Sequence, residues 1–275
     1  MLSKIIKAKG EEIEYLKTKA PLSELKAKIK DLEGAREFLK PLKPAQEGQQ
    51  SQNRSTESTV TRIIAEVKKA SPSQGVIRED FNPSKIAEIY QENGASAISV
   101  LTDKIFFQGD IGHLSMVKRV VTLPVLRKDF IIDEYQVFET RAYDADAILL
   151  IAAVLEKNQL KDYVYLSREL GMLPLIEVHT LTDIENALSI KETDLIGINN
   201  RDLNTFEVDI KTSEKLIQYI PKEITTVSES GIKKREDIVF LQEAGVDAFL
   251  IGETLLRERD IGNKLKELLG TLSKD

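Results

Sequence analysis

From residue 63 onward, short apolar segments alternate with segments of helical periodicity, and the alternation occurs eight times. The apolar segments have the length and β-branched composition of buried strands, and the segments between them have the 3.6-residue period of helices. The predicted strands are Ile63–Lys68, Ala97–Leu101, Val125–Lys128, Ala147–Ile151, Leu173–Glu177, Leu195–Asn199, Thr225–Ser228 and Ala248–Ile251. The predicted helices span residues 84–93, 112–120, 134–142, 156–170, 181–188, 210–219, 233–243 and 260–270. This repeat predicts a parallel sheet whose strands are joined by helices.

Glycine stands at three joins between a helix and the next strand, at Gly94, Gly171 and Gly245. A glycine just past the last helical residue is a common signal of a helix C-terminus. Eight strand–helix units match the (β/α)8 barrel in number and size. The alternative is a doubly wound open sheet, which usually has fewer units and a GxGxxG motif after its first strand, and that motif is absent here. The predicted fold class is therefore α/β, a (β/α)8 TIM barrel with an N-terminal helical extension.

The chain before the repeat has a different pattern. Residues 3–19 are predicted to form a helix, and residues 22–40 one or two more. Residues 41–59 are polar, without aromatic residues or periodicity, and we interpret them as a flexible linker or mobile loop; the alternative is an ordered lid. We expect residues 1–60 to be a helical extension with a polar linker and residues 61–275 the barrel, together one catalytic domain.

Composition excludes several classes of function. The net charge of −6 argues against general affinity for nucleic acid. The absence of cysteine excludes disulfides, thiol catalysis and thiolate metal sites, and His113 and His179 fit no metal-binding spacing. The chain has no apolar run of about 18 residues, and its first segment carries too many acidic residues for a signal peptide. We therefore expect no membrane association and a cytoplasmic location.

The ends of the predicted strands are where chemistry is expected, because the active site of a (β/α)8 barrel lies at the C-terminal ends of its strands. The first strand ends in Glu66 and Lys68, which alternation places on one face; the alternative is a frayed end with solvated charges. Polar or ionisable residues also end or follow five other strands, at Arg127, Lys128 and Asp129, at Glu177, at Asn199 and Arg201, at Ser228, Glu229 and Ser230, and at Glu253. So many charged strand ends predict a ring of functional groups.

Gly231 and Gly252 follow the last two strands, and Gly252 precedes ETLLRERD, which is predicted to form a short extra helix. Loops at this place in the barrel commonly bind phosphate through backbone N–H groups. The carboxylate of Glu253 would repel phosphate, so only its backbone N–H is expected to face the ligand. The alternative is that both glycines serve only to make tight turns.

Six motifs identify a resemblance to a known family. The segments EVKKASPSQG, VLRKDFIID, PLIEVH, GINNRDL, SESGI and FLIGETLLR resemble the indole-3-glycerol-phosphate synthases of tryptophan biosynthesis, in the same order. The polar stretch around residues 44–58 looks longer than the connection usual in that family. The resemblance implies a carboxy-lyase (EC 4.1.1.48) that converts 1-(2-carboxyphenylamino)-1-deoxyribulose 5-phosphate to indole-3-glycerol phosphate, with loss of carbon dioxide and water.

The resemblance also implies roles for four catalytic residues. Lys128 is expected to be the general acid at the substrate carbonyl, and Glu177 the base and charge stabiliser. Lys68 is expected to hold the anthranilate carboxylate and to share proton delivery. Glu66 would orient Lys68 and take part in the dehydration. How the two lysines and the two glutamates divide the proton transfers stays open at this stage.

The remaining implications concern the ligand and its contacts. The phosphate would be held by Ser71, Gly231, Gly252 and the Glu253 backbone, the hydroxylated chain by Asn199, Arg201, Glu229 and Ser230, and the aromatic ring by Phe107, Phe130 and Leu203. No metal and no organic cofactor is implied, because restored aromaticity drives the decarboxylation. The ligand is a small phosphorylated molecule, and we expect a monomer that could associate weakly with other tryptophan-pathway enzymes.

The alternatives to this function are another barrel enzyme of the same pathway and a barrel that binds a sugar phosphate without turnover. Phosphoribosylanthranilate isomerase, another barrel of the pathway, has a cysteine at the end of its first strand, which this chain lacks. A non-catalytic sugar-phosphate-binding barrel should have lost Lys68, Lys128 or Glu177, and all three are present.

Overall fold

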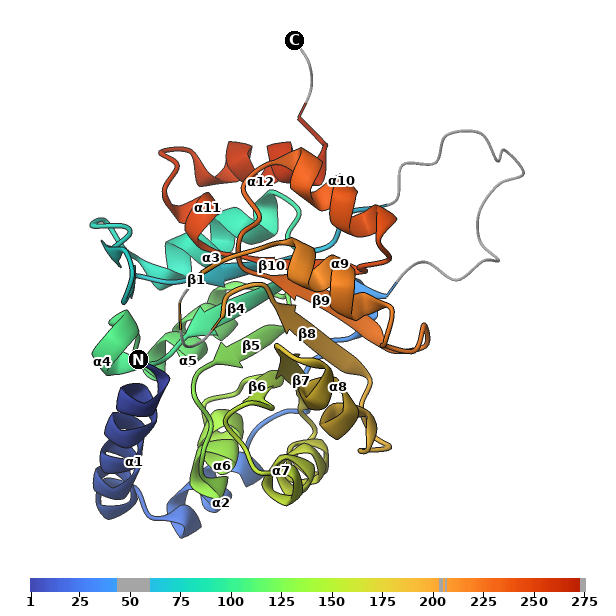
Figure 1. The fold of residues 1–275 in the computed structure, drawn as a ribbon. Coiled ribbons are helices and arrows are strands. Elements are labelled where there is room, and N and C mark those ends of the chain that lie inside the picture. The colour runs from blue at the N-terminus through green and yellow to red at the C-terminus, as the bar shows by residue number, and fades with distance from the viewer. Residues whose placement is uncertain (44–59, 203–204, 206, 273–275) are drawn as a thin grey trace.

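The computed structural model describes residues 1–43, 60–202, 205 and 207–272. Within them, parallel strands close into a barrel in the order β1-β10-β9-β8-β7-β6-β5-β4 (Figure 1). The strands are β1 (Ile63–Val67), β4 (Ala97–Leu101), β5 (Val125–Lys128), β6 (Ala147–Ile151), β7 (Leu173–Val178), β8 (Leu195–Asn199), β9 (Thr225–Glu229) and β10 (Ala248–Ile251). The predicted (β/α)8 barrel is therefore confirmed, with strand ends that shift by one residue at most. A linker or mobile loop was predicted over residues 41–59. Of these, 44–59 lie outside the described part of the chain, whereas Leu42 belongs to a 3-10 turn and is buried.

Helices follow the strands around the outside of the barrel (Figure 1). They are α3 (Pro83–Glu92), α5 (Gly112–Val120), α6 (Glu134–Ala142), α7 (Lys157–Glu169), α8 (Leu181–Leu188), α9 (Lys211–Ile217), α10 (Arg235–Glu243) and α12 (Ile261–Leu269). The short helix expected after Gly252 is present as α11 (Glu253–Leu256). Two small elements were not predicted: the short helix α4 (Lys104–Phe107), and an antiparallel hairpin of β2 (Ala70–Ser71) and β3 (Gly75–Val76).

Side-chain caps set the points at which several helices begin. The Asn82 side chain accepts a hydrogen bond from the Lys85 N–H, and Pro83 occupies the first helical position of α3. Asp133 and Thr180 begin α6 and α8 with reciprocal capping boxes. These caps end each loop at a defined residue, so the loops at the C-terminal end of the barrel have fixed lengths.

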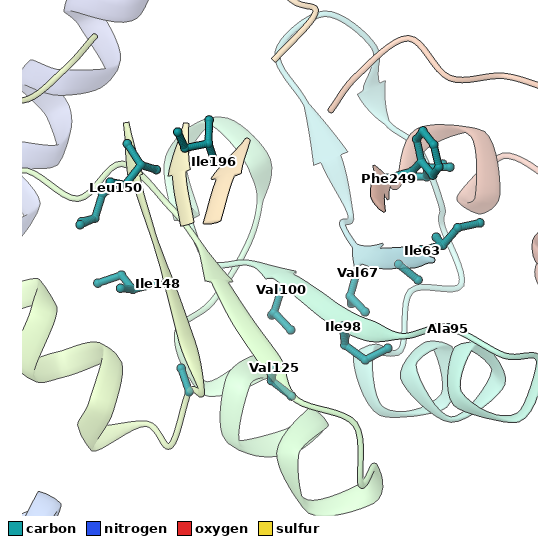
Figure 2. Packing of buried hydrophobic residues seen from close by; sticks show 14 of the residues in the cluster. Ile63, Val67, Ala95, Ile98, Val100, Val125, Ile148, Leu150, Ile196 and Phe249 are labelled. Atoms are coloured by element: carbon teal, nitrogen blue, oxygen red, sulfur yellow. The ribbon is translucent and has the colours of Figure 1, made fainter. Parts of the chain in front are cut away.

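Strand alternation divides the apolar residues into two cores. One set faces outward and packs against the helices; Figure 2 shows Ile63, Ile98 and Val125 on this side. The other set fills the inside of the barrel and includes Ile64, Ala97, Leu126, Ala147, Leu149, Leu175, Leu195, Val227, Ala248 and Leu250. Both faces of each strand are buried, as a closed parallel barrel requires.

The N-terminal extension contains α1 (Leu2–Lys19), α2 (Leu22–Lys30) and the 3-10 turn η1 (Lys40–Leu42). The prediction of one or two helices over residues 22–40 is confirmed for α2, but residues 31–39 are not helical, so it was wrong beyond Lys30. Beyond Gly34 the chain runs to the barrel, where Phe38 and Leu42 join the inner core and are 1% and 0% exposed. Burying two large apolar side chains there stabilises this irregular path more than a longer surface helix would.

Candidate active site

The inward-facing rows of the barrel end in polar side chains. On a strand, residues two apart share a face, so Glu66 continues the inner row of Ile64, and Glu177 that of Leu175. The residues that end inner rows in this way are Glu66 on β1, Lys128 on β5, Glu177 on β7, Asn199 on β8 and Glu229 on β9. All five lie at the C-terminal ends of their strands. The barrel therefore fills its lower interior with aliphatic side chains and gathers ionisable groups at one end.

The described site residues predicted from the sequence line one cavity at this end of the barrel. They are Glu66, Lys68, Ser71, Phe107, Lys128, Phe130, Glu177, Asn199, Arg201, Glu229, Ser230, Gly231, Gly252 and Glu253. Leu203 lies outside the described residues, so the structure does not place it. Apolar side chains of inner strand positions, including Leu149 and Leu250, form the floor.

Lys128 stands between two buried carboxyl groups. Its Nζ lies 2.9 Å from Glu177 Oε2 and 3.2 Å from Glu229 Oε2, and its side chain is 15% exposed. Burial acts to lower the pKa of Lys128, but its carboxyl neighbours, and Glu177 first among them, outweigh burial and hold that pKa above its ordinary value. The Lys128 side chain is thus held in its ammonium form, and it faces the cavity.

The two carboxyl groups around Lys128 have opposite protonation behaviour. Burial acts to raise the pKa of Glu177, but the Lys128 ammonium outweighs it and holds that pKa below its usual range. Burial, reinforced by the charge of Glu177 and only partly offset by Lys128, raises the pKa of Glu229 to about 8. Asn199 Nδ2 donates to Glu177 Oε1 at 3.1 Å, whereas neither Glu229 oxygen has a hydrogen-bond partner among the described residues. The arrangement therefore favours the carboxylate form of Glu177 and the protonated form of Glu229.

Glu66 and Lys68 form a second ion pair across the cavity mouth. Lys68 Nζ lies 2.6 Å from Glu66 Oε2, and the two side chains are 14% and 5% exposed. β1 ends at Val67, so Lys68 is the first residue beyond the strand and still continues its inner face. The burial of both groups rules out the alternative of a frayed, solvated strand end.

The model of the family described as "Indole-3-glycerol phosphate synthase" matches residues 2–268. The chain belongs to the indole-3-glycerol phosphate synthase family. A relative of that name from Legionella pneumophila (strain Paris) is 47% identical over 270 residues, covering 98% of each chain. Another from Trichodesmium erythraeum is 46% identical over 273 residues, covering 98% of this chain and 88% of the relative.

A solved structure supports the fold alone. The thiamine phosphate pyrophosphorylase from Pyrococcus furiosus aligns with a TM-score of 0.57 and 14% sequence identity, over 77% of this chain and 95% of that one.

In the present chain, Asn200 supports the loop after β9. This buried asparagine was not predicted from the sequence. Asn200 Nδ2 donates to Ser228 Oγ and to the Ser230 carbonyl, both at 3.0 Å, and Asn200 Oδ1 accepts from the Ser213 N–H and hydroxyl. The Ser230 carbonyl thus held belongs to a residue with φ of +68°. The adjoining Gly231 has φ of +85°, and a Cβ there would lie 2.6 Å from Val208 Cγ1. The sequence GINNRDL contains two consecutive asparagines, and only the first, Asn199, was predicted as a site residue. The second asparagine was the signal that could have indicated this supporting role.

Two glycines make room for the buried carboxyl groups. A Cβ atom on Gly197 would overlap Glu229 Oε1, and one on Gly252 would overlap Glu66 Oε2 and lie 2.9 Å from Glu66 Cβ. Gly252 was predicted to let the backbone approach a phosphate. The structure adds that it leaves space for Glu66.

Gly252→Ala is therefore expected to displace Glu66 and to break its ion pair with Lys68. Because a 1 Å misplacement of a reacting group can cost a factor of about 10², we expect kcat/KM for indole-3-glycerol phosphate formation to fall by about that factor. The matched control is Gly10→Ala within α1, where no atom lies within 4 Å of the added Cβ. Steady-state kinetics of both variants test this; an unchanged kcat/KM in Gly252→Ala would show that Glu66 need not stay in place.

The family member's N-terminal helix also reaches the cavity, which the sequence did not indicate. Leu2 and Ile5 of α1 line it together with Phe107 and Phe130, whose ring centroids are 6.2 Å apart.

Among the described residues, no cluster of three or more His, Asp or Glu side chains could hold a metal ion. Within those same residues, no helix is both long and apolar enough to cross a membrane.

Proposed function

We propose that this chain catalyses the reaction for which its family is named, the conversion of 1-(2-carboxyphenylamino)-1-deoxyribulose 5-phosphate to indole-3-glycerol phosphate. The observation that carries the proposal is the position of the Lys128 ammonium, which lies 2.9 Å from a Glu177 oxygen and 3.2 Å from a Glu229 oxygen in the wall of the cavity. The conversion as a whole needs an acid and a base within reach of one small substrate, and this triad supplies both.

In the first step, the substituted ring carbon attacks the ketone carbon, and the ketone oxygen acquires negative charge. The Lys128 ammonium stabilises that charge and then gives the oxygen a proton, which makes a hydroxyl group. The pKa of Lys128 is raised by its carboxylate neighbours, but an alkoxide is basic enough to take the proton. Glu229, whose raised pKa favours its protonated form, then returns a proton to the lysine.

The later steps remove carbon dioxide and water. Lys68, oriented by Glu66, holds the substrate carboxylate until the bond to the ring breaks and the ring regains its aromaticity. The new hydroxyl then leaves as water after it is protonated by a lysine ammonium. Glu177, which stays ionised beside Lys128, takes the proton lost from the neighbouring carbon, and this completes the indole.

The binding roles follow from the arrangement of the cavity. Ser71 and the loops at Gly231 and Gly252 surround one end, and we assign the phosphate to their N–H and hydroxyl groups. Phe107 and Phe130 stand at another part of the wall and are assigned to the aromatic ring. Asn199, Arg201, Glu229 and Ser230 are assigned to the hydroxylated chain.

The proposal includes the organisation of the molecule. The extension and the barrel act as one catalytic domain, since Phe38 and Leu42 are buried in the inner core and Leu2 and Ile5 line the cavity. We propose that the enzyme acts as a monomer. A cytoplasmic location fits an enzyme of amino-acid biosynthesis.

Fluorescence of the indole product provides the direct test. Purified chain should convert the carboxyphenylamino-deoxyribulose phosphate to a fluorescent indole, and inorganic phosphate should inhibit competitively. No turnover, together with phosphate-sensitive substrate binding, would replace the proposal with a non-catalytic sugar-phosphate-binding barrel.

Glu229 should make stability depend on pH. In the folded chain it keeps its proton up to a pKa of about 8, whereas in the unfolded chain it ionises near its ordinary value. Between these two pKa values, the folded state therefore binds more protons than the unfolded state. The stabilisation that the protonated Glu229 contributes to the free energy of unfolding is thus present at low pH and is lost as the pH rises. We expect a slope difference approaching about 1.4 kcal/mol per pH unit between wild type and Glu229→Gln, from urea denaturation at several pH values. Parallel curves would show that Glu229 is ionised.

A further inference from the structure

A lysine interrupts the apolar face of α1. Ile5, Lys9 and Ile13 are spaced four residues apart, so they lie on one side of the helix, and all three are buried. Lys9 is 3% exposed. A lysine this deeply buried is uncommon unless it is paired, and it costs stability unless its partners compensate for lost hydration.

The partners of Lys9 are two buried aspartates at strand ends of the barrel. Lys9 Nζ lies 3.0 Å from Asp103 Oδ2 and 3.0 Å from Asp129 Oδ1, and a further carboxylate, that of Glu12, is at 2.7 Å. Burial acts to lower the pKa of Lys9, but Asp129 and Asp103 outweigh burial and hold that pKa above its ordinary value. Figure 1 shows the N-terminal part of α1 beside α4, as this pairing requires.

Each aspartate holds a segment that carries part of the cavity wall. Asp103 caps α4 by accepting the Phe106 N–H at 2.8 Å, and α4 carries Phe107. Asp129 follows Lys128 directly and accepts the Phe130 N–H at 2.8 Å. One ammonium therefore connects the two segments that present Phe107 and Phe130 to each other.

We propose that Lys9 is a positioning residue for catalysis, which sets the aromatic wall of the cavity by tying α4 and the end of β5 to helix α1. The proposal rests on the assignment of Phe107 and Phe130 to the substrate ring. Lys9 itself does not line the cavity. Its influence on the substrate passes through Asp103 and Asp129.

Removing the ammonium should disturb α4 more than β5. Asp129 keeps a second cation, Arg127, at 3.1 Å, whereas Lys9 is the only cation paired with Asp103 among the described residues. A buried carboxylate left without its cation must move, gain a proton or draw in water. The C-terminal end of α1 stays docked, because Tyr135 Oη donates to the Ala20 carbonyl at 2.9 Å.

Lys9→Met tests the proposal, with Lys17→Met as its matched control. Lys17 forms another ion pair between α1 and the barrel, with Asp133 at 2.8 Å, but it is 37% exposed and far along the helix from the cavity. Lys9→Met should raise KM at least about fivefold and change kcat less than about twofold, because a displaced wall weakens ground-state and transition-state binding alike. Lys17→Met should change neither constant by more than about twofold, as expected for an exposed pair.

A double variant separates positioning from simple charge compensation. In Lys9→Met/Asp103→Asn, the asparagine still caps α4 but no longer carries a charge that needs a partner. We expect the melting temperature lost in Lys9→Met to return while KM stays raised. Recovery of both would show that Lys9 only neutralises Asp103, and this would overturn the proposal.

Hydrogen exchange supplies a readout that is independent of turnover. Amides of residues 101–110 should exchange faster in both Lys9 variants than in wild type, and not in Lys17→Met. If wild type makes no indole product, the proposed function fails, but exchange still decides whether Lys9 fixes α4. Equal exchange in Lys9→Met and Lys17→Met would contradict the positioning role.

Discussion

Lys128→Met is expected to lower kcat by a factor of about 10²–10⁴, the contribution typical of a general acid. Methionine keeps the length and apolar stem of the side chain but cannot stabilise or protonate the ketone oxygen. The change also removes the cation between Glu177 and Glu229, so the pKa of Glu177 should rise toward its ordinary range or above it. Single-turnover kinetics, which isolate the chemistry from product release, provide the measurement.

Lys118→Met is the matched control for this variant. Lys118 is also buried and is paired with a buried carboxylate, Asp146, but it does not line the cavity. Its loss should lower the melting temperature and leave kcat within a fewfold of wild type. If Lys128→Met keeps its kcat and only raises KM, Lys128 binds the substrate and the acid must be sought elsewhere, with Lys68 next in line.

The barrel itself could be predicted because its signal is local and repeated. Each strand is a short apolar segment with both faces buried, so position in the sequence and composition were enough to bound it. The same regularity predicted the C-terminal strand ends as the functional edge. Glu66, Lys128 and Glu177 could therefore be chosen before any contact between them was known.

What escaped prediction depends on contacts between distant segments. Residues 31–39 were predicted as helix from their spacing, but Phe38 is drawn into the inner core, which no local pattern encodes. The sequence analysis did not single out Lys9, although it shares a face with Ile5 and Ile13. Its burial becomes understandable only when Asp103 and Asp129 stand opposite.

Charge states were also beyond the sequence. Glu177 and Glu229 are the same residue type at matching strand ends, yet their pKa values move in opposite directions. The difference arises because Glu177 is hydrogen-bonded to both Lys128 and Asn199, while Glu229 has only the proximity of the ammonium. Two carboxyl groups around one cation cannot both ionise easily, so the better hydrogen-bonded one keeps the charge.

Glu177→Gln is expected to lower kcat by a factor of about 10²–10⁴, since glutamine cannot accept the proton released during dehydration. Glutamine is nearly isosteric and its amide oxygen can still accept a hydrogen bond from Lys128 or Asn199, so the substrate should bind with little change in KM. The lowered pKa of Glu177 places the acidic limb of the wild-type pH–rate profile below the usual range for a glutamate. As the pH falls, activity is therefore retained until the pH reaches the lowered pKa of Glu177, and it is lost below that pKa because the base becomes protonated.

The control for Glu177→Gln is Glu139→Gln, which makes the same change at another buried carboxylate. Glu139 Oε2 lies 2.9 Å from an Arg127 nitrogen, and both side chains are nearly inaccessible, but neither lines the cavity. Glu139→Gln should therefore lower the melting temperature and leave both kcat and the acidic limb unchanged. If Glu177→Gln retains wild-type kcat while the acidic limb persists, the base is another carboxylate, and Glu66 becomes the residue to replace next. If kcat falls and the acidic limb disappears only in Glu177→Gln, the end of β7 supplies the base, because loss of a buried charge alone would affect both variants.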